Sequence, residues 1–195
     1  MLKKIMRLAL TPLLVLGLTF SGFGMAFASP EVELSDLQIR EKLDEIGDRY
    51  EVGEELSEED ASFVKEHVGS PSESAQLMEE GGHETFSGSY GSVEGFGFIK
   101  YTKASLRTSF EGYINVQTSD LSKRSSLGAE ARIMAYGIIG SGGFGKIFDR
   151  TYTVTDTDSN YVAKNFANSF EGIGSIMDFN YRGIVNGDTF NLYPN

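Results

Sequence analysis

The charge of this chain changes abruptly near Ser87, and that change limits how the chain can fold. Residues 29–86 contain eighteen Asp and Glu against four Lys and Arg, whereas residues 87–195 contain ten of each. Seventeen of the 23 Phe and Tyr residues also lie after Ser87. An acidic segment with little to bury therefore precedes a neutral, aromatic-rich segment that can form a hydrophobic core.

Side chains after Ser87 alternate between apolar and polar with the period of two that is typical of a half-buried β-strand. The alternating segments are residues 105–117, 129–137, 148–154 and 176–181. Asn186 and Gly187 lie between two apolar runs, where this pair predicts a tight hairpin. The sequence therefore predicts a mainly β fold, an antiparallel β-sandwich or small barrel, over residues 87–195.

Two short helices are expected in the acidic segment over residues 29–69. Ser35 and Gln38 fit a capping box, and Ser57 has the position of an N-cap ahead of three acidic residues. Apolar residues recur at helical spacing: Ile39, Leu43, Ile46 and Tyr50 in the first helix, and Ala61, Val64 and Val68 in the second. So thin an apolar stripe needs a partner surface, and the β domain is the nearest one.

Residues 70–86 are rich in Ser, Glu, Gly and Pro, a composition typical of a linker. Proteolytic nicking concentrates in exposed linkers of this kind. Two interpretations of the acidic helical hairpin stay open. It is a pro-segment removed by cleavage in the linker, or it persists beside the β domain in the mature protein.

The first 28 residues have the three parts of a secretory signal peptide. Lys3, Lys4 and Arg7 form the basic region, residues 8–20 are mainly apolar, and Ala26-Phe27-Ala28 is a cleavage site. We therefore expect a secreted protein that begins at Ser29. The chain has no cysteine, so it has no lipobox, and no stable membrane anchor is expected after signal cleavage.

Several classes of chemistry are disfavoured by composition. The two histidines, His67 and His83, precede the β domain, so a zinc site or a histidine-activated nucleophile within residues 87–195 is excluded. Neither half has the basic surplus that nucleic-acid binding requires. A hydrolase would need a pair of carboxylates. The candidates are Glu94, Glu111, Glu130, Asp149, Glu171 and Asp178.

One segment has the oxygen spacing of a calcium loop. Asp156, Asp158 and Asn160 fit a D-x-D-x-N pattern, although Tyr161 follows where a calcium loop has glycine. A wide turn explains the same residues. Gly140–Lys146 has the spacing of a phosphate-binding loop, but a strand-like segment follows in place of a helix, so a Gly-rich hairpin loop is predicted. Calcium is therefore the one cofactor considered, as a weak hypothesis.

Three functions remain compatible with these features. The first is a secreted non-enzymatic binding or bioactive β-domain protein, which includes an antimicrobial or toxin-like factor with an acidic pro-segment. The second is a cell-envelope or matrix interaction protein. The third is a carboxylate-based hydrolase. The expected partner is a protein or a cell surface whose identity the sequence does not specify.

Overall fold

The computed structural model describes residues 34–68, 80–104, 106–120, 126–140 and 142–195. The predicted signal peptide, its cleavage site and residues 70–79 of the predicted linker lie outside these residues. Two helices precede eight strands: α1 (Asp36–Arg49), α2 (Glu58–His67), β1 (Glu80–Tyr90), β2 (Val93–Lys103), β3 (Arg107–Thr118), β4 (Leu127–Ile139), β5 (Gly143–Asp156), β6 (Tyr161–Glu171), β7 (Ile173–Val185) and β8 (Asp188–Pro194).

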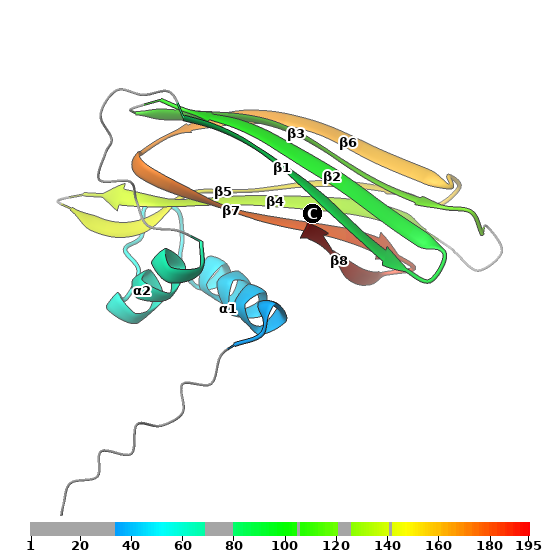
Figure 1. Cartoon of the computed structure of the whole chain (residues 1–195), viewed down its shortest axis with the longest axis horizontal. Coiled ribbons are helices and arrows are strands. Elements are labelled where there is room, and N and C mark those ends of the chain that lie inside the picture. The colour runs from blue at the N-terminus through cyan, green and yellow to red at the C-terminus, as the bar shows by residue number, and fades with distance from the viewer. Residues whose placement is uncertain (1–33, 69–79, 105, 121–125, 141) are drawn as a thin grey trace, which may run out of the picture. The chain divides into compact units, whose positions relative to one another are not determined.

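The strands form one antiparallel sheet in the order β5-β4-β7-β8-β1-β2-β3-β6. The sheet folds over into two layers, with β1, β2, β3 and β6 above β4, β5 and β7 (Figure 1). β8 joins the layers, and it pairs with β1 only at Phe86↔Pro194 and Ser87↔Tyr193. On the other side, the edge strands β5 and β6 are in contact without hydrogen-bonded pairing. The result is a nearly closed, barrel-like sheet, which confirms the predicted fold class.

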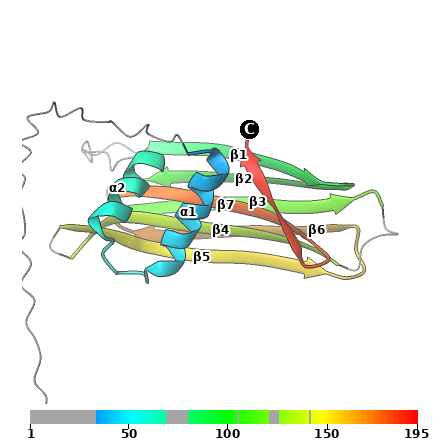
Figure 2. The ribbon, with the colours of Figure 1, turned by 90° about the horizontal axis from the view of Figure 1, so that it is seen from below.

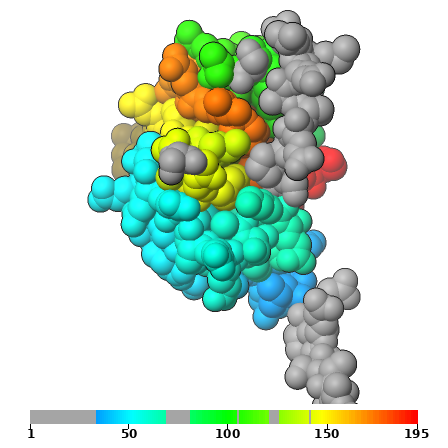
Figure 3. Space-filling view, turned by 90° about the vertical axis from the view of Figure 1, so that its left-hand side faces the viewer, coloured from blue at the N-terminus to red at the C-terminus, as the bar shows by residue number. Residues whose placement is uncertain are grey.

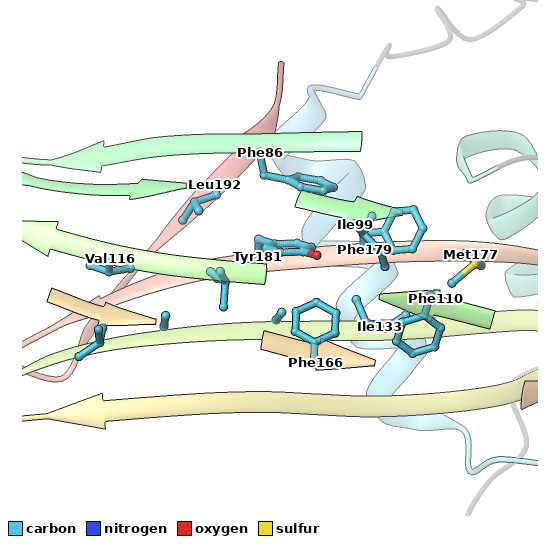
Figure 4. Close-up of a cluster of buried hydrophobic side chains, with 14 of the residues drawn as sticks. Phe86, Ile99, Phe110, Val116, Ile133, Phe166, Met177, Phe179, Tyr181 and Leu192 are labelled. Carbon is cyan, nitrogen blue, oxygen red and sulfur yellow. The ribbon is translucent and has the colours of Figure 1, made fainter. Parts of the chain in front are cut away.

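Aromatic and aliphatic side chains fill the space between the two layers (Figure 4). The ring of Tyr181 stacks on Phe86 with 4.3 Å between ring centroids, and its hydroxyl donates a hydrogen bond to the Phe98 carbonyl at 3.0 Å. Phe110 lies edge-on to Phe148 at 5.6 Å. Because this interior is packed with side chains, sites for ligands have to be sought at the ends and outer faces of the sheet.

The two predicted helices are present, with the expected N-terminal signals. The Ser35 hydroxyl accepts the Gln38 N–H at 3.4 Å, and the Gln38 side chain accepts the Ser35 N–H at 3.0 Å. The Ser57 hydroxyl accepts the Asp60 N–H at 3.2 Å. Each helix is too short to be stable alone, so the sheet on which the hairpin packs stabilises it.

The predicted linker over 70–86 is wrong at its C-terminal end, because residues 80–86 belong to β1. β1 pairs with β2 from Glu80↔Lys103 to Tyr90↔Val93, so backbone hydrogen bonds along the whole strand override its Gly-rich composition. A side chain at Gly82 would approach the Tyr101 ring to 2.3 Å. The glycine that resembles a linker residue thus leaves room for the Tyr101 ring, which would have to move if a side chain stood there.

Other local predictions from the sequence can be compared with the turns and strands of the structure. The tight hairpin at Asn186 and Gly187 is confirmed, with φ angles of 55° and 94°. The predicted Gly-rich loop over 140–146 is confirmed as a hairpin connection at Gly140 and Gly142, but residues 143–146 already belong to β5. β2 and β6 were not predicted. In β2 the inward positions include Gly95 and Gly97, which make room for Leu192 and Tyr181 and hide the alternation of the strand.

Candidate functional site

One outer face of the sheet, formed by β4, β5 and β7, lies under the helical hairpin (Figure 2). We call it the covered face. Its apolar side chains pack against the helices and the loop between them as a second hydrophobic cluster. The cluster comprises Met134, Tyr136, Phe144 and Ile176 from the sheet, and Leu43, Ile46, Leu56, Ala61, Phe63 and Val64 from the hairpin. In the space-filling view the cyan hairpin packs directly against the yellow strands (Figure 3).

Charged groups fasten the hairpin beside this cluster. Arg132 on β4 pairs with Asp48 of α1 at 2.6 Å and with Asp149 of β5 at 2.7 Å. The buried Lys146 ammonium donates to the Gly47 carbonyl at 2.7 Å and to Asp149 at 3.0 Å. Burial alone would raise the pKa of Asp149, but hydrogen bonds from Arg132 and Lys146 hold it below its usual value. Asp149 is therefore a structural ion-pair partner.

A second set of polar contacts links α1 to β7. Asp44 accepts two hydrogen bonds from the Asn180 amide, at 2.7 and 2.8 Å, and it also pairs with Arg182. Arg182 in turn lies 3.6 Å from Glu130. Two of the six predicted carboxylate candidates, Glu130 and Asp149, are thus engaged in ion pairs near the hairpin.

The opposite outer face belongs to β1, β2, β3 and β6, and no helix of the described part of the chain covers it (Figure 1). We call it the open face. Four aromatic side chains lie close together there: Phe96, Phe98, Tyr113 and Tyr161. Phe98 and Tyr113 face each other in register, with 6.0 Å between ring centroids, and the Tyr113 hydroxyl contacts that of Tyr161. Phe96 is 40% exposed and Tyr161 is 45% exposed.

Polar side chains surround these rings. Asn115 lies opposite Phe96, and its amide donates to the Tyr113 hydroxyl at 3.2 Å. A shallow pocket of about 400 Å³ beside Phe96 is also lined by Ser87, Asn115 and Gln117. A second, of about 490 Å³, lies further along β2 and β3 and is lined by Lys100, Ser109, Glu111 and Ser169. The open face therefore combines exposed rings with hydrogen-bonding groups, both uncharged side chains and the charged residues Glu94, Lys100 and Glu111.

The aromatic residues of the open face were not predicted from the sequence. A signal was nevertheless present, since Glu94, Phe96, Phe98 and Lys100 alternate with Val93, Gly95, Gly97 and Ile99. The glycines mask the inward half of this pattern, so the segment does not look amphipathic. Reading Gly as a core-facing residue would have identified both the strand and its outward rings.

A pocket of about 310 Å³ opens beside the end of β8, between α1, β1 and β7. It is lined by Asp36, Ile39, Arg40, Leu43, His67, Val68, Glu84, Phe86, Met177, Asp178, Phe179 and Pro194. Asp178 was a predicted carboxylate candidate, whereas Glu84 was assigned to the linker. Burial and the nearby Asp44 carboxylate raise the pKa of Asp178 to about 6, and burial raises the pKa of Glu84.

The remaining candidate carboxylates, Glu94, Glu111 and Glu171, are exposed residues on β2, β3 and β6. Glu171 lies at the end of β6 opposite Arg107, and Glu111 is paired in register with Ala167. Among the residues that the structure describes, Asp178 is the one candidate of the six that shares a pocket with a second carboxyl group of shifted pKa. That second group is Glu84.

The structure places the calcium candidates Asp156, Asp158 and Asn160 in and around the turn between β5 and β6. One Asp156 oxygen accepts the Asp158 N–H at 2.8 Å, and the Ser159 hydroxyl accepts the Tyr161 N–H at 3.1 Å. These are the contacts of an ordinary Asx turn. Within the described residues no group of three His, Asp or Glu side chains is placed to hold a metal ion, and the calcium site stays a prediction.

Comparisons with known proteins add no assignment. No protein-family model and no curated protein matches this chain. In the described part of the chain, no helix is both long and apolar enough to cross a membrane. Function is therefore inferred from the side chains of this chain alone.

Proposed function

We propose that this chain is a secreted, non-enzymatic binding protein that attaches to polysaccharide of the cell envelope through its open face. The observation that carries this proposal is a row of four rings on a sheet face without a helical cover, in which Phe96 and Tyr161 are exposed and Phe98 and Tyr113 between them are half-buried. Exposed aromatic clusters on a soluble protein mark interaction sites, because the rings gain by leaving water.

The chemistry of the open face suits a sugar polymer. A pyranose ring presents a face of C–H groups that packs on an aromatic ring, and it presents hydroxyls at its edge. Asn115, Gln117, Ser87 and Ser109 supply donors and acceptors for those hydroxyls. An extended, shallow surface also matches a long chain better than a compact ligand. The predicted signal peptide would export the protein to where such polymers occur.

Sedimentation with insoluble cell-wall polysaccharide tests the proposal. We expect the intact protein to sediment with the polymer, and the double substitution Phe96→Ala and Tyr161→Ala to weaken binding about tenfold or more, since each ring contact is worth on the order of 1 kcal/mol. Tyr90→Ala is the matched control, because Tyr90 is 54% exposed and stacks with Phe190 away from the row. Equal sedimentation of all three proteins, or none by the wild type, would reject the proposal.

A second candidate is an antimicrobial or toxin-like factor whose acidic hairpin is a pro-segment. The covered face favours it, because removal of the hairpin would expose Met134, Tyr136, Phe144 and Ile176. N-terminal sequencing of the secreted protein distinguishes the candidates. A species that begins between residues 69 and 80 supports the pro-segment, and a single species that begins at Ser29 contradicts it.

A further inference from the structure

The pocket beside β8 exists because the barrel-like sheet is incomplete there. β8 pairs with β7 only from Tyr181↔Leu192 to Val185↔Asp188, and it reaches β1 only at Phe86 and Ser87. Beyond these pairs the first half of β1 and the first half of β7 have no strand between them. α1 lies beside this opening and forms one wall of the pocket (Figure 2).

Charged groups of both signs line the pocket, and the Arg40 charge acts on both carboxyls without a direct ion pair. Arg40, Glu84 and Asp178 form no ion pair within the described part of the chain. The Arg40 guanidinium lies over the Tyr193 ring, 5.3 Å from its centroid. On the same face of β7, Asn180 and Arg182 are fully engaged with Asp44. Burial raises the pKa of Glu84 and Asp178 more than the Arg40 charge lowers it, so both carboxylates are disfavoured in the pocket.

Part of the pocket wall is apolar. Leu43 comes from α1, Phe86 from β1, and Met177 and Phe179 from β7, and all four are at most 8% exposed. A volume of about 310 Å³ accommodates a molecule of a few heavy atoms rather than a polymer. A suitable ligand would bring an anionic group for Arg40, a cationic group for the carboxyls and an apolar part for the walls.

We propose that this pocket binds a free α-amino acid with an apolar side chain, with its carboxylate toward Arg40 and its ammonium toward Glu84 and Asp178. A zwitterion brings a direct counter-charge to each of these groups at once, and the apolar part of the walls takes its side chain. Burial raises the pKa of both carboxyls, and an ammonium in direct contact would favour their charged forms. This site is independent of polymer binding at the open face.

Three probes with the same isobutyl side chain test the proposal by calorimetric titration of the intact protein at pH 7. L-Leucine has both charges, isoamylamine lacks the carboxylate, and 4-methylpentanoate lacks the ammonium. We expect leucine to bind at least about tenfold more tightly than either analogue, because each charge-assisted contact contributes that much or more. Saturable binding of leucine must also be absent in a variant with a blocked pocket, for which Leu43→Trp is suitable.

Substitutions in the pocket test which residue contacts the carboxylate of leucine and which residues contact its ammonium. Arg40→Gln should remove the advantage of leucine over isoamylamine, and Glu84→Gln with Asp178→Asn should remove its advantage over 4-methylpentanoate. Glu94→Gln, an exposed carboxylate on the open face, is the control and should leave all three affinities unchanged. Circular dichroism establishes that each variant is folded. No saturable leucine binding, or analogues that bind the wild type as tightly as leucine, would overturn the proposal without reference to any variant.

Discussion

The covered face and the open face are built from neighbouring strands of one antiparallel sheet, yet their outward residues differ. β4 is buried at almost every position from Leu127 to Gly137, because its inward residues meet the interior and its outward residues meet the hairpin. β3 alternates strictly between buried and exposed positions over its first six residues. A strand that is apolar on both faces requires a second cover, and here an acidic hairpin supplies it.

An aromatic ring gains free energy when it leaves water, and this gain is used differently on the two faces. Tyr136 on the covered face is fully buried, and its ring lies 6.4 Å from that of Phe144. Phe96 on the open face keeps 40% of its surface in water. A ring that is already buried stabilises the fold, whereas an exposed ring retains that free energy for a ligand. The comparison thus separates a structural surface from a binding surface.

The largest expected effect contrasts one ring from each face. Tyr136→Ala should lower the free energy of unfolding by about 3–5 kcal/mol, because it leaves a cavity between the hairpin and the sheet. Phe96→Ala should cost less, about 1 kcal/mol, because 40% of this side chain already lies in water. Urea denaturation of both variants measures the difference. Losses of similar size would mean that the open face is also structural, and the distinction between the faces would fail.

The ion pairs under the hairpin give a smaller and pH-dependent effect. Arg132→Met should cost about 1–3 kcal/mol at pH 7, since Asp149 loses one of its two cationic partners. The folded-state pKa of Asp149 lies below its unfolded value near 3.9, so its stabilisation is present above that pH and is lost as the pH falls through the folded pKa. The cost of Arg132→Met should therefore shrink below about pH 4.

The matched control is Arg150→Met, which removes an exposed arginine from β5. Urea titrations at pH 7 and pH 3 should show no comparable loss for this variant. A pH-independent cost for Arg132→Met would indicate that the lost packing of its long side chain, and not its charge, fastens the hairpin.

Much of the fold could be predicted because its signals are local. Ser35 and Ser57 mark helix starts, and Asn186 with Gly187 marks a tight turn, since each depends on residues that are close in the chain. The alternation in residues 105–117 and 129–137 likewise identified β3 and β4. β1 was missed because its pairing with β2, and not its own composition, makes it a strand.

The candidate sites could not be predicted, because they depend on the register between distant segments. Phe98 meets Tyr113 only through the alignment of β2 with β3. Glu84 and Asp178 share a pocket because β8 stops short of the ends of β1 and β7. Of these residues, Asp178 alone was a candidate carboxylate in the sequence, and spacing along the chain does not show which of the other five candidates faces it.

The next effect on stability is expected at Asp178, in the pocket beside β8. Its folded-state pKa of about 6 exceeds the unfolded value near 3.9, so between these pH values the folded protein holds a proton that the unfolded chain releases. Stability therefore falls as the pH rises through this window, and the full penalty applies above it. The groups that act on this carboxyl are Arg40 and Asp44 from α1, Arg132 from β4 and the Phe179 backbone.

Asp178→Asn should consequently raise the free energy of unfolding by about 1–2 kcal/mol at pH 7, because the side chain is partly exposed and screening reduces the gain. At pH 4 the variant and the wild type should be almost equally stable. Urea denaturation between pH 4 and pH 8 tests this, with Asp188→Asn, an exposed position at the start of β8, as the control. A gain that does not change with pH would exclude this carboxyl as its source.

The smallest expected effect is at the edge of the open face. Tyr161→Phe removes the hydroxyl that contacts Tyr113, but both rings remain in place, and water can replace the lost partner because Tyr161 is 45% exposed. The free energy of unfolding should change by less than about 0.5 kcal/mol. Polysaccharide binding should also persist, since the rings supply the stacking surface. A stability loss above about 1 kcal/mol would show that the two hydroxyls fasten β3 to β6, and the open face would then share the structural role of the covered one.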